Sequence, residues 1–205
     1  MTDSHREHWD VVYSTKGFDS VSWFQGLPTP SLAALELLDA HANQSLIDIG
    51  GGASNLVDVL IKRGWSDLSV LDLSEAALAE SKRRLGDLAT RVDWIVSDIT
   101  QWVPPRRYDF WHDRAVFHFL TNAEDRAAYA KRLSDGLAPS GAVVIATFAP
   151  SGPDRCSGLP VRRYDAESLA VEFGSAFEMV GNWTEDHVTP SGNRQAFTWC
   201  MFRKR

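Results

Sequence analysis

SLIDIGGGAS, residues 45–54, is the stretch that decides the fold class of this chain. Its first half, residues 45–49, is a short and mainly apolar run, which predicts a buried strand. Three glycines follow directly. Glycine lets the backbone turn sharply and approach a ligand closely, because it has no side chain. We therefore predict a strand that runs into a tight turn suited to ligand binding.

Runs of strand and helix character alternate on both sides of this stretch. A Pro pair at 28 and 30 precedes the first predicted helix. The other elements follow from apolar periodicity and from cap residues. We predict helices at 31–42, 55–63, 75–85 and 125–136, and strands at 68–72, 92–96, 108–111 and 142–148. Such alternation is typical of a mostly parallel sheet with right-handed crossovers and helices on both faces.

The last third of the chain has a different pattern. A loop rich in Gly, Pro and Ser covers residues 149–163, and a helix is predicted at 165–173. Two strand-like runs, 177–185 and 195–202, are joined by the turn residues 190–193. This short connection indicates a hairpin rather than a crossover. We therefore expect an α/β fold with five parallel strands and an antiparallel C-terminal strand pair, seven strands in all.

Length, charge and cysteine content restrict the class of protein. The 205 residues suit one domain over residues 1–205. The net charge of −6 argues against a broad basic surface for nucleic acid. No apolar run approaches the roughly 20 residues of a membrane span, and the polar N-terminus has no apolar signal core. Cys156 and Cys200 form no disulfide framework. We expect a cytoplasmic protein without a nucleic-acid or membrane partner.

Carboxylates stand at the ends of the second and third predicted strands. Asp72 follows the glycines by about 20 residues, a spacing that suits a carboxylate accepting hydrogen bonds from ribose hydroxyls. Asp98 follows the third strand, where it would accept a bond from an adenine amino group while Ile99 packs on the ring. Ligands of open α/β sheets bind beyond the carboxyl ends of the strands. These residues therefore predict a nucleoside site.

The pattern Asp48-x-Gly50-x-Gly52, followed by Asp72 and Asp98, resembles the class I S-adenosylmethionine-dependent methyltransferases over roughly residues 43–148. That family usually has a third small residue where this chain has Ser54, which is a mild departure from the pattern. The resemblance implies a Rossmann-like sheet and S-adenosylmethionine as the cofactor, with S-adenosylhomocysteine as its product. It also implies that the following residues contact the cofactor: Asp48, Gly50, Gly51, Gly52, Asp72, Leu73, Asp98 and Ile99.

The N-terminal segment carries a second resemblance. Its residues WDVVY, 9–13, followed by Trp23 and Phe24, look like the leading element of a methyltransferase subgroup. That subgroup includes lysine methyltransferases of translation elongation factor 1-alpha and of citrate synthase, and many uncharacterised bacterial methyltransferases are similar to this chain. The resemblance implies that Trp9, Tyr13 and Trp23 fold over the cofactor. We accordingly expect residues 1–30 to form an aromatic lid within the single domain.

The end of the fourth strand supplies candidates for the acceptor side of the site. His112 and Asp113 are the catalytic candidates, because they have groups that orient or deprotonate an acceptor. The candidates for acceptor binding are Arg114, which suits an anionic acceptor, His118, Cys156 and Tyr164. His112 and His118 have no further His or Cys at ligand spacing, so we expect no metal site.

The predicted reaction is transfer of a methyl group by in-line displacement to a small-molecule acceptor. A protein lysine methyltransferase is the alternative, supported by the N-terminal resemblance. A nicotinamide-dependent oxidoreductase is a weaker candidate, because the last glycine of G-x-G-x-x-G is missing after Gly52. A non-catalytic cofactor-binding module is a further candidate. The acceptor atom and the oligomeric state stay open.

Overall fold

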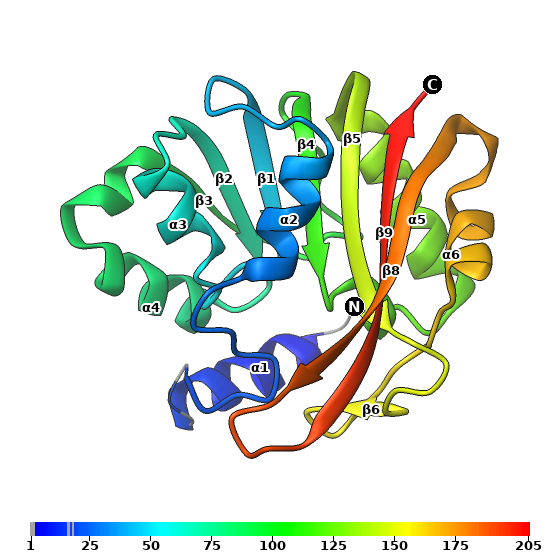
Figure 1. Cartoon of the computed structure of the whole chain (residues 1–205). Coiled ribbons are helices and arrows are strands. Elements are labelled where there is room, and N and C mark those ends of the chain that lie inside the picture. Colours follow the sequence, from blue (N-terminus) through cyan, green and yellow to red (C-terminus); the bar gives the residue numbers. More distant parts are fainter. Residues whose placement is uncertain (1–2, 16, 18) are drawn as a thin grey trace.

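A seven-stranded sheet forms the centre of the computed structural model, which describes residues 3–15, 17 and 19–205 (Figure 1). Its strand order is β3-β2-β1-β4-β5-β9-β8. The first five of these run parallel, and β9 and β8 are antiparallel at one edge. The strands are β1 Ser45–Ile49, β2 Asp67–Asp72, β3 Val92–Val96, β4 Tyr108–Arg114, β5 Leu137–Phe148, β8 Phe177–Val188 and β9 Arg194–Lys204. The expected fold class is confirmed.

Helices cover both faces of this sheet. The α-helices are α1 Asp3–Thr15, α2 Thr29–Leu37, α3 Leu56–Lys62, α4 Glu75–Leu85, α5 Ala123–Gly136 and α6 Ala166–Phe173. Short 3₁₀ helices are η1 Gly86–Arg91, η2 Phe117–Phe119 and η3 Gly174–Ala176. One apolar core joins the sheet to α2, α3 and α4, and a second joins it to α5 and α6. The result is three layers (Figure 1).

The first strand shows why the sheet is buried on both faces. Leu46 packs in the core beside α2 and α3, whereas Ile47 and Ile49 pack in the core beside α5. Successive side chains of a strand point to opposite faces, so a strand that is buried at every position is covered on both faces. β8, at the edge of the sheet, instead alternates between more exposed and less exposed residues.

Several elements differ from the expected boundaries. The first predicted helix begins earlier, at Thr29, with Pro30 in its first turn, and it ends at Leu37. The fourth and fifth strands are longer than expected. The loop after β5 contains a small two-stranded sheet, β6 Arg155–Cys156 and β7 Leu159–Pro160.

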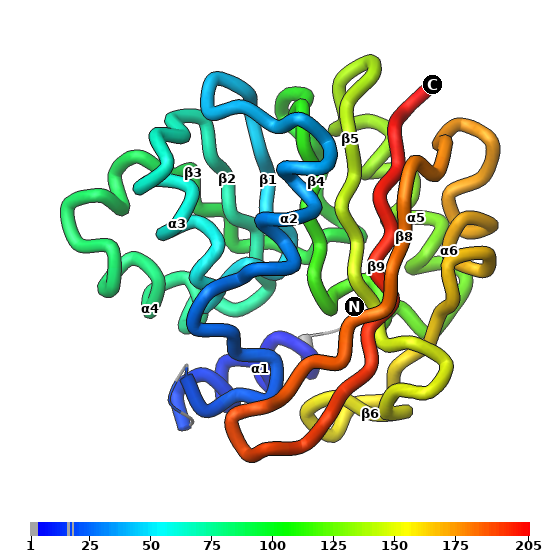
Figure 2. The backbone as a smooth tube through the Cα atoms, viewed as in Figure 1, coloured from blue at the N-terminus to red at the C-terminus, as the bar shows by residue number. Residues whose placement is uncertain are grey.

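The N-terminal helix α1 is the element that the sequence pattern did not predict. It lies across the carboxyl ends of the parallel strands, below the sheet in Figures 1 and 2. Of its described side chains only Val12 is fully buried. The Ser74 hydroxyl, just after β2, donates to the Asp10 carboxylate at 2.6 Å. This bond fixes α1 to the end of the sheet where ligands bind in such folds.

None of the helices in the described part of the chain is both long and apolar enough to cross a bilayer.

Candidate functional site

A cleft opens between α1 and the carboxyl ends of β1, β2 and β4. It contains about 650 Å³ of space between protein atoms, part of it open to solvent. Most of its lining is apolar, and Asp72 and Arg114 are its charged members. Nine of the residues assigned to the site from the sequence line it: Trp9, Tyr13, Trp23, Gly50, Asp72, Leu73, Ile99, Arg114 and Cys156. We refer to it below as the main cleft.

Aromatic side chains from three parts of the chain form one wall of the main cleft. The ring centroid of Trp9 lies 5.6 Å from that of Trp23 and 5.3 Å from that of Phe119, both nearly perpendicular. Tyr13 lies 6.2 Å from Trp23, and burial raises the pKa of its hydroxyl, so it is protonated at neutral pH. Edge-to-face packing of this kind stabilises the ring positions. Phe119 was not assigned from the sequence, because only the fold brings it beside Trp9.

The glycine turn after β1 packs against the turn after β4. Gly50 has a φ of +67°, and a Cβ placed on it would lie 2.0 Å from a methyl carbon of Val116. Its N–H donates to the Leu71 carbonyl at 2.6 Å. Only glycine combines this backbone conformation with this close approach. The turn therefore presents bare backbone to the main cleft.

Asp72 connects the end of β2 to this turn. Its Oδ2 accepts the Gly52 N–H at 2.9 Å, and its Oδ1 accepts the Ser74 N–H at 2.8 Å. Burial raises the pKa of Asp72 to about 6, against the effect of these hydrogen bonds, and the nearby charge of Asp48 raises it further. The carboxylate thus lines the main cleft and titrates close to neutral pH.

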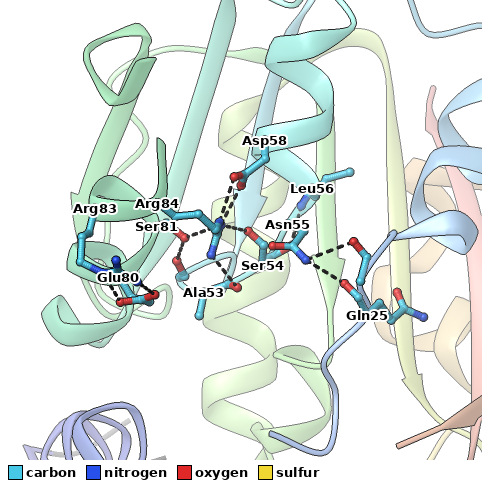
Figure 3. Close-up of polar contacts among 12 residues, drawn as sticks. Gln25, Ala53, Ser54, Asn55, Leu56, Asp58, Glu80, Ser81, Arg83 and Arg84 are labelled. Atoms are coloured by element: carbon cyan, nitrogen blue, oxygen red, sulfur yellow. Dashed lines mark hydrogen bonds and ion pairs between the residues drawn. The ribbon is translucent and has the colours of Figure 1, made fainter. Parts of the chain in front are cut away.

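An arginine outside the expected site bonds to the backbone that follows the three glycines (Figure 3). Arg84 of α4 donates to both carboxylate oxygens of Asp58, from Nε at 2.9 Å and from Nη2 at 2.7 Å. Nη2 also donates to the Ser54 carbonyl at 2.7 Å. The Ser81 hydroxyl donates to the Gly52 carbonyl. The sequence offered no signal for these contacts of Arg84 and Ser81, because the partners are far apart in the chain.

Asp98 takes part in local structure instead of the main cleft. Its Oδ1 accepts from the N–H of Thr100 at 2.9 Å and from the hydroxyl of the same residue at 2.8 Å. The neighbouring residues Ser97 and Ile99 line the main cleft, whereas Asp98 does not. The geometry supports the expected contact for Ile99 and gives none for the Asp98 side chain.

A smaller side pocket adjoins the main cleft and shares Tyr13, Trp23, Gly50 and Arg114 with it. His112 lines this pocket. Its Nδ1 lies 2.6 Å from Asp48 Oδ1, and its Nε2 lies 2.9 Å from the Ser31 hydroxyl of α2. Both ring nitrogens are therefore engaged, which disfavours a role for His112 as a base toward an acceptor.

Asp48 and Gly51 also line the side pocket. Asp48 Oδ2 is buried and has no hydrogen-bond partner among the residues described. A Cβ on Gly51 would lie 2.3 Å from this oxygen, so glycine is required at that position. An unpaired carboxylate oxygen beside bare backbone suits a cationic group of a ligand.

Asp113 faces away from both the main cleft and the side pocket. It is fully buried, and its carboxylate accepts the Tyr129 hydroxyl at 2.7 Å and the Val116 N–H at 2.9 Å. The Tyr129 oxygen in turn accepts the Trp111 indole N–H at 2.9 Å. Burial raises the pKa of Asp113 to about 6. This geometry counts against the expected contact with an acceptor. It indicates instead that the Asp113 carboxylate stabilises the turn after β4.

His118 and Tyr164 also lie behind the wall of the main cleft. His118 Nδ1 accepts the Phe148 N–H at 3.3 Å, and burial lowers its pKa to about 3, so the ring is neutral. Tyr164 is buried beside Phe117, and its hydroxyl donates to Glu172 at 3.4 Å. Neither lines the main cleft, so direct contact with an acceptor is not supported for either.

Arg114 and Cys156 do line the main cleft. Arg114 Nη1 donates to the Trp23 carbonyl at 2.7 Å, and the guanidinium lies over the Phe197 ring at 5.0 Å. Burial lowers the pKa of Arg114 to about 10, which leaves it charged at neutral pH. Burial raises the pKa of the Cys156 thiol to about 12, so it stays protonated. Arg114 therefore supplies a positive charge to the main cleft.

Replacing Gly50 by alanine tests the close approach of the two turns. The matched control is Gly64→Ala, because Gly64 also has a positive φ (+89°) but open space around it. We expect the control to lose about 1–2 kcal/mol from backbone strain. Gly50→Ala should lose about 1–3 kcal/mol more from the clash with Val116. Denaturant unfolding measures both, and Val116→Ala should restore part of the loss. Equal losses at the two glycines would contradict the contact.

Replacing Asp113 by alanine tests whether this residue supports the turn. The change leaves the Tyr129 hydroxyl and two backbone N–H groups without a buried partner. We expect a loss of about 2 kcal/mol or more in the free energy of unfolding. Asp186→Ala, at an exposed ion pair with Arg194, should change it by less than about 0.5 kcal/mol. Unchanged stability together with a large loss of activity would show instead that Asp113 acts on the reacting groups.

Comparison with known proteins shows which proteins this chain resembles. Residues 46–141 match a family model described as a methyltransferase domain. Trans-aconitate 2-methyltransferase of Afipia carboxidovorans is 28% identical over 134 residues, which are 64% of this chain and 47% of that protein. The match thus spans less than half the length of that relative.

Two solved structures share the fold over almost the whole chain. A S-adenosylmethionine-dependent methyltransferase of Anabaena variabilis has a TM-score of 0.76 at 17% identity and covers 99% of this chain and 94% of its own. The 1,6-didemethyltoxoflavin-N1-methyltransferase of Burkholderia thailandensis, solved with its substrate and S-adenosylhomocysteine, has a TM-score of 0.70 at 18% identity and covers 98% and 84%. The family match includes β1, the glycine turn and the end of β2. Residues 46–141 are therefore similar to a methyltransferase domain, and the chain shares the fold of these S-adenosylmethionine-dependent methyltransferases.

Proposed function

We propose that this protein transfers a methyl group from S-adenosylmethionine to a small-molecule acceptor. The observation that carries the proposal is the main cleft, where a glycine turn, a strand-end carboxylate and an aromatic wall meet at the carboxyl ends of the parallel strands. Ligands of open α/β sheets bind at this place. The trans-aconitate methyltransferase named above supports a small acceptor, because its name specifies one.

The residues present fit the cofactor. The Asp72 carboxylate is placed to accept hydrogen bonds from ribose hydroxyls, and Leu73 and Ile99 offer apolar surface to an adenine ring. Gly50 allows close approach of the amino-acid end. The unpaired Asp48 oxygen would gain a partner from the ammonium group of that end. Each of these assignments is part of the proposal.

The aromatic wall has two tasks in the proposed reaction. The bound cofactor supplies a methyl group on a positively charged sulfur, which is already an activated electrophile. Trp9, Tyr13 and Trp23 would exclude water from the reacting atoms, and their ring faces stabilise positive charge. Residues 1–30 would then act as the lid over the cofactor. The cleft also orients the acceptor for in-line attack, which is a large part of catalysis in such reactions.

Apart from Asp72 and Asp48, which the proposal assigns to the cofactor, the described residues that line the main cleft and the side pocket offer no free base. Both nitrogens of His112 are engaged, and the Tyr13 hydroxyl and the Cys156 thiol are protonated at neutral pH. An acceptor atom that is nucleophilic without loss of a proton to the protein fits this arrangement best. In this proposal the protein promotes methyl transfer by positioning the acceptor and by its charged groups, and not by removing a proton.

Methyl transfer from tritiated S-adenosylmethionine tests the proposal. The purified protein is incubated with cell extract, and the label is followed in separate protein and small-molecule fractions. We expect label in the small-molecule fraction. Label in protein alone would favour the lysine methyltransferase alternative, which the relatives do not favour. A protein that binds neither S-adenosylmethionine nor S-adenosylhomocysteine would overturn the proposed function.

The affinity for S-adenosylhomocysteine should depend on pH through Asp72. Its ionised form accepts ribose hydroxyls, and its pKa is about 6. Protonation on acidification removes that form, so lowering the pH from 7.5 to 5 should weaken binding about tenfold. Calorimetry measures the affinity at each pH, with circular dichroism as a check of folding.

Asp72→Asn is the matched variant, because it cannot titrate. We expect it to bind more weakly at pH 7.5 and to lose most of the pH dependence. Asp113 also has a pKa of about 6 but lies outside the main cleft, so Asp113→Asn should keep the dependence of the unmodified protein. The same pH profile in Asp72→Asn as in the unmodified protein would contradict the role of Asp72.

A further inference from the structure

We propose that Arg114 is a carboxylate-binding residue, and that the methyl acceptor carries the carboxylate. The inference rests on the proposed function and specifies its substrate class. Arg114 is the last residue of β4 and lines both the main cleft and the side pocket. It is the only arginine or lysine among the described residues that line either of them.

Most of the hydrogen-bonding capacity of Arg114 is unused. Nη1 donates to the Trp23 carbonyl, but Nε and Nη2 are buried and have no hydrogen-bond partner in the described part of the chain. Burying such donors unpaired is costly, and most for a charged group. A ligand that pairs with them would remove this cost.

Of the two acidic residues near Arg114, Glu185 is engaged through both carboxylate oxygens and Asp48 through one. Glu185 accepts the Gln25 amide at 2.9 Å through one carboxylate oxygen and the Trp199 indole N–H at 2.7 Å through the other. One oxygen of Asp48 lies against His112. Neither forms an ion pair with Arg114, although both act on its pKa through their charge. The protein thus leaves Nε and Nη2 of Arg114 unpaired, although two carboxylates lie near enough to act on its pKa.

Another arginine of this chain shows which ligand fits. Arg84 uses the same two atoms, Nε and Nη2, to bind the two oxygens of the Asp58 carboxylate (Figure 3). The guanidinium fork matches a carboxylate in this two-point geometry, which is stronger and more specific than a single charged bond. Arg114 presents that edge without a carboxylate. A ligand carboxylate is therefore its natural partner.

Two sources of a carboxylate are present in the proposed reaction, the acceptor and the amino-acid end of the cofactor. The cofactor is the competing source, because Arg114 shares the side pocket with Asp48, the residue proposed for the ammonium group of that end. The contact of the guanidinium with β9 decides for the acceptor. Its guanidinium lies over Phe197 of β9, on the side of β4 that is away from β2 and Asp72. A ligand carboxylate at this place lies away from the Asp72 carboxylate, which the proposal assigns to the ribose.

Three variants test the inference: Arg114→Met removes the charge and the donors, Arg114→Lys keeps the charge without the fork, and Arg194→Met changes an exposed arginine as the control. Calorimetry measures the affinity of each variant for S-adenosylmethionine and for its decarboxylated analogue. With S-adenosylhomocysteine present, it also measures the affinity for the carboxylates succinate, benzoate and trans-aconitate. Thermal melting confirms that each variant is folded.

We expect Arg114→Met to bind the carboxylates about 10- to 100-fold more weakly, with S-adenosylmethionine affinity within about twofold of the unmodified protein. Arg114→Lys should recover part of the loss, and Arg194→Met should bind normally. A loss for S-adenosylmethionine but not for its decarboxylated analogue would assign the carboxylate to the cofactor. No difference for any of these ligands overturns the inference. Failure of the unmodified protein to bind S-adenosylmethionine would instead overturn the proposed function.

Discussion

The hydrogen bond from the Gly52 N–H to Asp72 Oδ2 is the contact on which the site depends. It joins the turn after β1 to the end of β2, and it fixes both the bare backbone and the carboxylate. A Cβ on Gly52 would lie 2.5 Å from the same oxygen, so the bond requires glycine there. Ser81 and Arg84 hold the carbonyls of the turn from the other side. The shape of the main cleft follows from these few polar contacts.

Buried charges show which groups support the fold and which are left for a ligand. The Asp113 carboxylate and the His112 ring both have their polar atoms paired inside the protein. Arg114 and Asp48 each keep buried polar atoms without a partner in the described residues, and both line the side pocket. Because an unpaired buried polar atom is costly, such atoms beside a pocket are expected where a ligand completes the pairing.

Much of the fold was predictable from local pattern. Short apolar runs, helical spacing and the glycine turn predicted all seven strands of the main sheet and the antiparallel pair. The helix α1 was missed, because it buries little apolar surface and is held by a few specific contacts, such as that between Asp10 and Ser74. Its aromatic residues were still assigned to the site through the resemblance, and they line the main cleft.

Side-chain direction explains what the sequence predicted less well at the site. Successive residues of a strand face opposite ways, so His112 and Arg114 point toward the pockets while Asp113 points toward Tyr129 and α5. A strand end places residues near a ligand but does not say which of them face it. Phe119 and Arg84 were missed for another reason. Their partners come from distant segments, and only the fold brings them together.

A crystal structure of the protein with S-adenosylhomocysteine tests the central claim most directly. The account predicts the ribose hydroxyls within hydrogen-bond distance of Asp72 and the adenine beside Leu73 and Ile99. A separate cavity lies near Asp109 and Arg203, at the opposite end of the sheet. Density for the ligand there, or in the main cleft with the ribose away from Asp72, would contradict the account.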